Sequence, residues 1–266
     1  MDNQNMTTTK SAKMTRQQLR LARRLDQEAK AFSRKWASHL NIKFKAYGLK
    51  AKEAFLHLAH VNHLKAQSIE FDWTDLTDAT ATGAGSLDLD YRPMYLSIAR
   101  TTYKTINDVL GLSVNMDAQD EQDIIALGGK WMGLVDLPQQ TKDAIFKAIQ
   151  EGRAEGEGAA DIANRILDAV AAGPWSTSEM RATMIARTET KFAQNAASID
   201  AYESADNVDS VMVYDGRLPT SDEECMARDG TEVSFDEARA MADDEHPNGT
   251  LSFAPIVENA FDNGGT

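Results

Sequence analysis

Apolar residues recur at helical spacing along most of the chain. The stretch over residues 14–44 shows this most clearly, with basic residues between apolar positions at Leu21, Leu25, Phe32, Trp36 and Leu40. A one-sided stripe of this kind predicts a long amphipathic helix. Gly48 is expected to end it, because glycine is unfavourable inside helices, and a second helix is expected over about residues 49–69.

Further helices are predicted where the same spacing continues. Their ranges are 88–110, 117–127, 138–150 and 159–171, with a loop rich in Thr, Asp and Gly at 71–86. Three glycines within 151–158 are expected to interrupt helical structure before the helix at 159–171. Gly173-Pro174 marks a boundary. Ser176 with Glu179 three positions later is a capping-box pattern that predicts a long helix ending near Ser204.

After Asn207 the apolar pattern changes from helical spacing to that of strands. The sequence predicts strands over 208–215 and 231–235, a short helix over 236–242 and an extended segment over 249–257. We therefore expect a mainly α protein with a small C-terminal α+β domain. Its predicted divisions are a disordered N-terminus (1–13), a helical body with a basic N-terminal arm (14–174), the α+β domain (175–257) and a flexible tail (258–266).

Charge is unevenly distributed along the chain. The net charge is −13, yet residues 1–65 hold 14 Lys and Arg against 4 Asp and Glu. This polarity predicts an acidic partner for the basic end, with a merely solvated basic helix as the alternative. No apolar run reaches about 18 residues, so no membrane partner is expected. The single cysteine excludes an internal disulfide and is typical of a protein made in a reducing cytoplasm.

The basic side chains of the first helix form a candidate binding surface. They can neutralise DNA phosphates, and because no base-reading motif accompanies them, such binding would not depend on DNA sequence. An acidic protein surface is an equally permitted partner. The first four of these residues share one helix face, and the set is Arg16, Arg20, Arg23, Arg24, Arg34 and Lys35.

Polar residues with possible chemistry gather in the turn-rich stretch between residues 215 and 255. They are Asp215, Asp222, Cys225, Asp229 and His246. Asp222 and Cys225 have the two-residue gap of a metal knuckle, and His246 can supply a third ligand. The alternative is a buried cysteine, turn-forming aspartates and a hydrogen-bonded histidine. The sequence has no recognisable catalytic triad, phosphate loop or dinucleotide motif.

The order of several short motifs resembles a known family. They are A-R-T-E-T at 186–190, D-x-x-C-x-x-x-D-G at 222–230, E-V-S-F-D-E-A at 232–238 and H-P-N-G-T-L-S-F-A-P at 246–255. In this order, over about residues 140–257, they are similar to the Mu F-like head morphogenesis family, the minor capsid proteins of tailed bacteriophages. The positions that carry the resemblance are Arg187, Thr188, Glu189, Asn195, Asp215, Asp222, Cys225, Asp229, Gly230, His246, Pro247 and Asn248.

The resemblance implies a non-enzymatic virion component that lies inside the head near the portal vertex. Its implied partners are the portal protein, other head proteins and packaged double-stranded DNA, and its implied role is in head assembly or genome delivery.

The resemblance also bears on metal binding at the turn-rich end. Family members commonly carry C-x-x-C and H-P-N-C-R-C, an arrangement similar to a zinc ribbon. Here Asp222, Gly249 and Leu251 stand at three of those cysteine positions, so no cofactor is expected. If a metal were bound, its ligands would be Asp222, Cys225 and His246.

Two functions of other classes remain as alternatives. One is a metal-dependent hydrolase or nuclease that uses Asp215, Asp222 and His246. The other is a free-standing protein that binds DNA irrespective of sequence through the arginines of the first helix.

Overall fold

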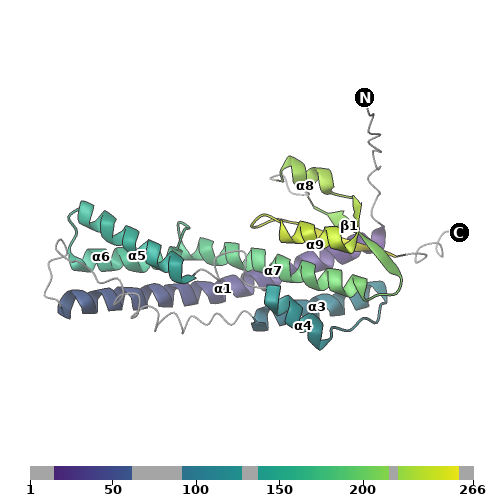
Figure 1. Cartoon of the computed structure of the whole chain (residues 1–266), viewed down its shortest axis with the longest axis horizontal. Coiled ribbons are helices and arrows are strands. Elements are labelled where there is room, and N and C mark those ends of the chain that lie inside the picture. The colour runs from purple at the N-terminus through teal and green to yellow at the C-terminus, as the bar shows by residue number, and fades with distance from the viewer. Residues whose placement is uncertain (1–14, 62–91, 128–136, 216–220, 258–266) are drawn as a thin grey trace, which may run out of the picture. The chain divides into compact units, whose positions relative to one another are not determined.

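The computed structural model describes residues 15–61, 92–127, 137–215 and 221–257 (Figure 1). Its helices are α1 (Arg16–Val61), α3 (Arg92–Leu110), α4 (Ala118–Leu127), α5 (Leu137–Ala154), α6 (Ala159–Ala172), α7 (Ser178–Glu203), α8 (Glu223–Arg228) and α9 (Phe235–Asp243). Its strands are β1 (Val208–Tyr214), β2 (Glu232–Val233) and β3 (Ser252–Val257). The predicted fold class, mainly α with a small C-terminal α+β part, is confirmed. The predicted N-terminal disorder, the loop at 71–86 and the C-terminal tail lie outside the described residues.

The elements form two compact units, each assembled from segments far apart in sequence. The first contains residues 1–30, 92–128 and 190–266, and the second contains 31–91 and 129–189. The long helices α1 and α7 each contribute to both units, so the chain does not divide at one point along its length. The predicted boundary between residues 174 and 175 stays a prediction about sequence domains.

The sheet of the first unit is antiparallel and has the order β2-β1-β3. Buried side chains from two helices donate hydrogen bonds to backbone carbonyls around β3. Asn195 Nδ2 donates to Leu251 at 3.0 Å, Tyr202 OH to Phe253 at 3.2 Å, and Gln18 Nε2 to Pro255 at 2.9 Å. These bonds satisfy carbonyls that burial would otherwise leave unpaired, and they fix the sheet against α7 and the start of α1.

The core of the second unit corrects the prediction that Gly48 ends a helix. Helix α1 runs through Gly48 without interruption. A Cβ atom built on Gly48 would lie 2.3 Å from the carbonyl oxygen of Leu167 in α6. Glycine therefore serves close packing between two helices here, and Tyr47, Ala51 and Phe55 complete the contact with α5 and α6.

Several other element boundaries differ from the predictions. Helix α5 continues to Ala154, because Gly152 is buried against Ile162 and does not break it. The predicted capping box does not start α7. Thr177 is the cap instead, its Oγ1 accepting the Met180 N–H at 3.1 Å. Strand β2 is only two residues long, and α8 forms where the sequence suggested turns alone. Among the described helices, none combines the length and apolar character needed to cross a membrane.

Candidate functional site: the turn cluster at the end of β1

The turn cluster lies where β1 ends and where two later segments return to the sheet. It is defined by Asp215, Asp222, Cys225, Arg228, Glu245 and His246. Asp215 directly follows β1. Asp222 is the N-cap of α8, and Cys225 and Arg228 lie within that helix. Glu245 and His246 lie in the loop after α9. All six belong to the first compact unit.

Arg228 is the central cation of this cluster. Its Nε donates to Asp215 Oδ2 at 2.6 Å, and its Nη2 pairs with Glu245 Oε2 and lies 3.7 Å from the sulfur of Cys225. The Asp215 side chain is completely buried, and its second oxygen accepts from Thr250 Oγ1 at 2.7 Å. Burial alone would lower the pKa of Arg228, but its bond to Asp215 and the nearby carboxylate charges raise it overall. The guanidinium therefore stays charged and ties α8 to the end of β1 and to the loop after α9.

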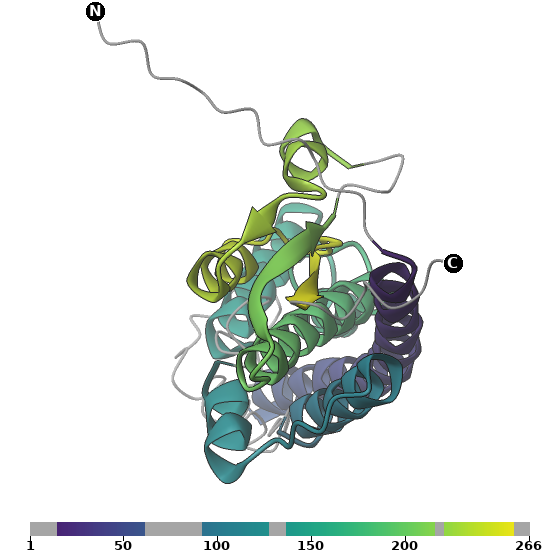
Figure 2. The ribbon, with the colours of Figure 1, turned by 90° about the vertical axis from the view of Figure 1, so that its right-hand side faces the viewer.

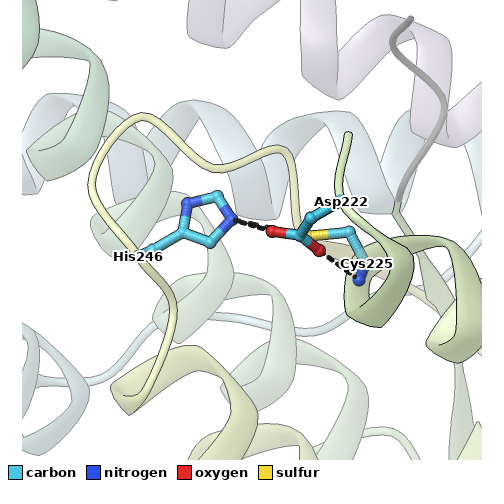
Figure 3. Close-up of side chains that lie close together, drawn as sticks. All are labelled: Asp222, Cys225 and His246. Carbon is cyan, nitrogen blue, oxygen red and sulfur yellow. Dashed lines mark hydrogen bonds and ion pairs between the residues drawn. The ribbon is translucent and has the colours of Figure 1, made fainter. Parts of the chain in front are cut away.

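The spacing of Asp222 and Cys225 has a simple local cause. Asp222 is the N-cap of α8, and its carboxylate accepts the Cys225 N–H at 2.8 Å (Figure 3). A side-chain oxygen at the N-cap commonly bonds the N–H three positions on, so a two-residue gap is expected without any metal. This bond is also the main cause of the lowered pKa of Asp222.

His246 completes a group of three potential ligands. Its Nε2 lies 3.5 Å from Asp222 Oδ2 and 3.4 Å from Cys225 Sγ (Figure 3). One ligand atom from each of the three residues falls within 4.8 Å of the others, and within the described residues no other such group is found. The structure thus brings together the three residues named as metal ligands if a metal were bound.

The surroundings of this group do not fit the four-ligand zinc ribbon that the resemblance implies. Leu251 is completely buried and offers no ligand atom. A Cβ atom on Gly249 would lie 1.5 Å from Glu245 Oε1, so the Glu245 side chain fills the space that a cysteine there would need. The Cys225 thiol is buried, and burial is the first cause that raises its pKa, to about 12.

Asp215 does not join the other residues of the proposed hydrolytic set. Its two carboxylate oxygens are used by Arg228 and Thr250, and it is absent from the group formed by Asp222, Cys225 and His246. The carboxylate is therefore sequestered from solvent and from the histidine. This geometry gives the hydrolase alternative no support.

Two motif positions act through the backbone. Asp229 Oδ1 accepts the Asp215 N–H at 3.0 Å, and Gly230 has a φ of 78° while its N–H donates to Val213 at 2.8 Å. A positive φ of this size favours glycine, so this motif closes the turn between α8 and β2.

The His246-Pro247-Asn248 motif is a tight turn. The Gly249 N–H donates to the His246 carbonyl at 3.1 Å, and Asn248 is the only non-glycine residue with positive φ in the described chain, at 66°. Proline at the second position and asparagine at a third position with positive φ fit a type II turn. The motif is thus explained by backbone geometry.

The motif on α7 is mostly buried. Arg187 is exposed, whereas Thr188, Glu189 and Asn195 are buried. Lys191, one turn after Arg187 on the same helix, is only partly exposed, and desolvation lowers its pKa.

The arginines of α1 form a separate candidate surface, also in the first unit as far as Arg24. Arg16, Arg20 and Arg23 are exposed and have no ion-pair partner among the described residues. Arg24 differs, because it pairs with Glu28 at 3.4 Å and with Asp108 at 3.3 Å. Arg34 and Lys35 are exposed but belong to the second unit.

Comparison with known proteins supports the resemblance drawn from the motifs. The search gave no significant match to a curated protein or to a solved structure. The model of the family described as Phage Mu protein F like protein does match, over residues 139–250. This segment includes most of α5, all of α6 and α7, and the turn cluster, and it ends at Thr250. Over residues 139–250, the chain is therefore similar to the Phage Mu protein F like family.

Proposed function

We propose that the protein is a phage head morphogenesis protein that acts as a structural component of the virion. The observation that carries this proposal is the family match over residues 139–250. Its matched motifs are occupied with capping, turn formation and burial, as expected of a folded recognition or assembly module. The protein would be made in the host cytoplasm and incorporated into the head near the portal.

The finer part of the proposal concerns the partner of α1. Arg16, Arg20 and Arg23 recur at i, i+4 and i+7, so they present three cations on one helix face. With no neutralising carboxylate among the described residues, they suit contact with the phosphates of packaged DNA. No base-reading element accompanies them, so we propose contact that is independent of DNA sequence.

We further propose that the turn cluster is neither catalytic nor metal-bound. The Arg228 network, meaning Arg228 with Asp215 and Glu245, supplies an internal cation that links the three segments. Asp215 and Glu245 are largely removed from solvent. These contacts support a structural role for the residues that otherwise suggest hydrolysis.

The test is association with head components. The tagged full-length chain is co-expressed with the portal and the major head protein of the phage that encodes it, and procapsids are isolated by sedimentation. Sedimentation of the chain with procapsids, and its retention by immobilised portal, are expected. A chain that remains entirely in the soluble fraction and does not bind portal would contradict the proposal.

A further inference from the structure

A pocket lies between α4, α7 and α9 of the first unit, apart from the turn cluster and the α1 arginines. Its volume is about 390 Å³, which is within the range of ligand-binding pockets. Phe192, Ile199 and Ala242 are buried residues of its lining, and Ala196 is partly buried. The pocket therefore has an apolar floor.

The more exposed residues around this floor are acidic. They are Asp120, Asp123, Asp200, Glu203 and Asp243, and the only basic residue in the lining is Arg239. Arg239 Nη2 lies 3.2 Å from Asp200 Oδ1 and also pairs with Glu203. Asp120, Asp123 and Asp243 have no cationic partner among the described residues. The pocket thus already binds one guanidinium and retains an excess of negative charge.

The neighbouring Tyr103 lies close to the carboxylates of this pocket. Tyr103 OH donates to Asp120 Oδ2 at 3.3 Å, and burial, followed by the charges of Asp120 and Asp200, raises the pKa of Tyr103. The field arises from carboxylates on three helices, α4, α7 and α9, which line the same pocket.

The chemistry of the occupant follows from this combination. Among the residues described, Asp222, Cys225 and His246 form the one group of three potential metal ligands, so the carboxylates of the pocket do not converge as a set of three. Nucleic acid would be repelled. A lysine or arginine side chain has an apolar stem and a charged end, which match an apolar floor and an acidic rim.

We propose that this pocket docks a basic segment of a partner protein. A lysine or arginine of the partner lies among Asp120, Asp123 and Asp243, and an adjacent apolar side chain packs on Phe192 and Ile199. Figure 2 shows α9 and the start of α1 on opposite sides of α7. Contact with a basic protein and contact with DNA therefore use different faces of the same unit, and the pocket does not depend on the function proposed for α1.

The direct test uses the full-length protein and a labelled peptide of alternating lysine and leucine, with fluorescence anisotropy as the readout. The test variant is Asp120→Asn with Asp123→Asn, which removes two rim charges while keeping side-chain acceptors. Its matched control is Asp206→Asn with Asp209→Asn, two exposed carboxylates outside the pocket. Ala196→Leu, which fills the floor without changing charge, is an independent second variant.

We expect the peptide to bind the wild-type protein, and the test variant to weaken binding at least about tenfold, while the control pair changes it less than about twofold. Ala196→Leu should also weaken binding, and replacing leucine by serine in the peptide should do the same. Equal losses in the test and control variants would show attraction to overall charge and would overturn the proposal. So would undiminished binding of the lysine-serine peptide, or no binding to the wild-type protein.

Discussion

Arg228 is the cation around which the turn cluster is organised. Its guanidinium has 16% of its side-chain surface exposed, and its partners Asp215 and Glu245 have 0% and 11%. Ion pairs at such burial are costly to break singly, because the partners left behind are charged and removed from water. The stability of this part of the fold should therefore depend strongly on one residue.

Replacing Arg228 tests this dependence. We expect Arg228→Met to lower the free energy of unfolding by about 3–5 kcal/mol, since two buried carboxylates lose their cation. Arg100→Met is the matched control, because Arg100 pairs with Glu121 while 61% exposed, and it should cost less than about 1 kcal/mol. The measurement is denaturant unfolding followed by circular dichroism. Similar losses for both variants would mean that the Arg228 network contributes no more than a surface pair.

The reactivity of Cys225 tests the proposal that the turn cluster binds no metal. Its thiol is buried and its pKa is raised to about 12, so reaction with an aromatic disulfide reagent at neutral pH should be at least about a hundredfold slower than in the unfolded chain. A chelator should leave the rate unchanged, because no metal is expected to protect the sulfur. Rapid labelling in the native state, or labelling that accelerates on chelation, would contradict this account.

At the scale of elements, close packing explains the largest departure from the predicted helices. Gly48 gives the sequence signal of a helix end, yet it lies within the continuous helix α1, where it permits close approach of α6. A glycine inside a helix costs about 1 kcal/mol of stability relative to alanine, and the free energy gained from packing between helices can exceed a cost of that size.

The substitution Gly48→Ala separates these two effects. Helix propensity predicts stabilisation of about 1 kcal/mol, whereas a Cβ atom 2.3 Å from the Leu167 carbonyl oxygen predicts a loss of about 1–3 kcal/mol. We expect the loss, measured by thermal or denaturant unfolding. The control, Ala46→Gly at an exposed position of the same helix, should cost about 1 kcal/mol through propensity alone. Stabilisation by Gly48→Ala would show that the two helices are not in close contact there.

The elements themselves were largely predictable, and their roles at the turn cluster were less so. The change from helical to strand spacing after Asn207 located β1, and the spacing of the apolar residues located α3 and α6. The pattern D-x-x-C predicts a metal knuckle, but the same spacing occurs when an aspartate caps a helix and the cysteine is the third residue of that helix. The sequence alone does not distinguish the two cases. Arg228 was missed because its partners, Asp215 and Glu245, are 13 and 17 positions away and meet it only in the folded chain.

At the scale of the whole molecule, charge is divided between surfaces with different expected partners. The α1 arginines are suited to phosphates, and the pocket between α4, α7 and α9 is suited to a basic segment. The network of buried charges in the turn cluster faces inward and adds to neither surface. A protein that joins DNA and protein within a phage head would need surfaces of both kinds.

The DNA contact makes a quantitative prediction. Each phosphate contact contributes about 0.9 to the slope of log affinity against log salt, so Arg16→Gln, Arg20→Gln and Arg23→Gln together should reduce that slope by roughly 3. Binding of the full-length protein to DNA fragments of unrelated sequence is measured over a range of salt. The matched control neutralises Lys30, Lys45 and Lys104, which already pair with carboxylates. An equal reduction of the slope in the control would show that the three arginines of α1 are not a specific DNA contact.

The most direct test of the structural role is the composition of the phage head. Heads of the phage that encodes this chain are purified and analysed by quantitative mass spectrometry, alongside heads from the same phage with the gene interrupted. We predict that the chain is present in wild-type heads, and that heads lacking it are defective in assembly or genome delivery. Its absence from purified wild-type procapsids and mature heads would contradict the assignment as a structural component of the head.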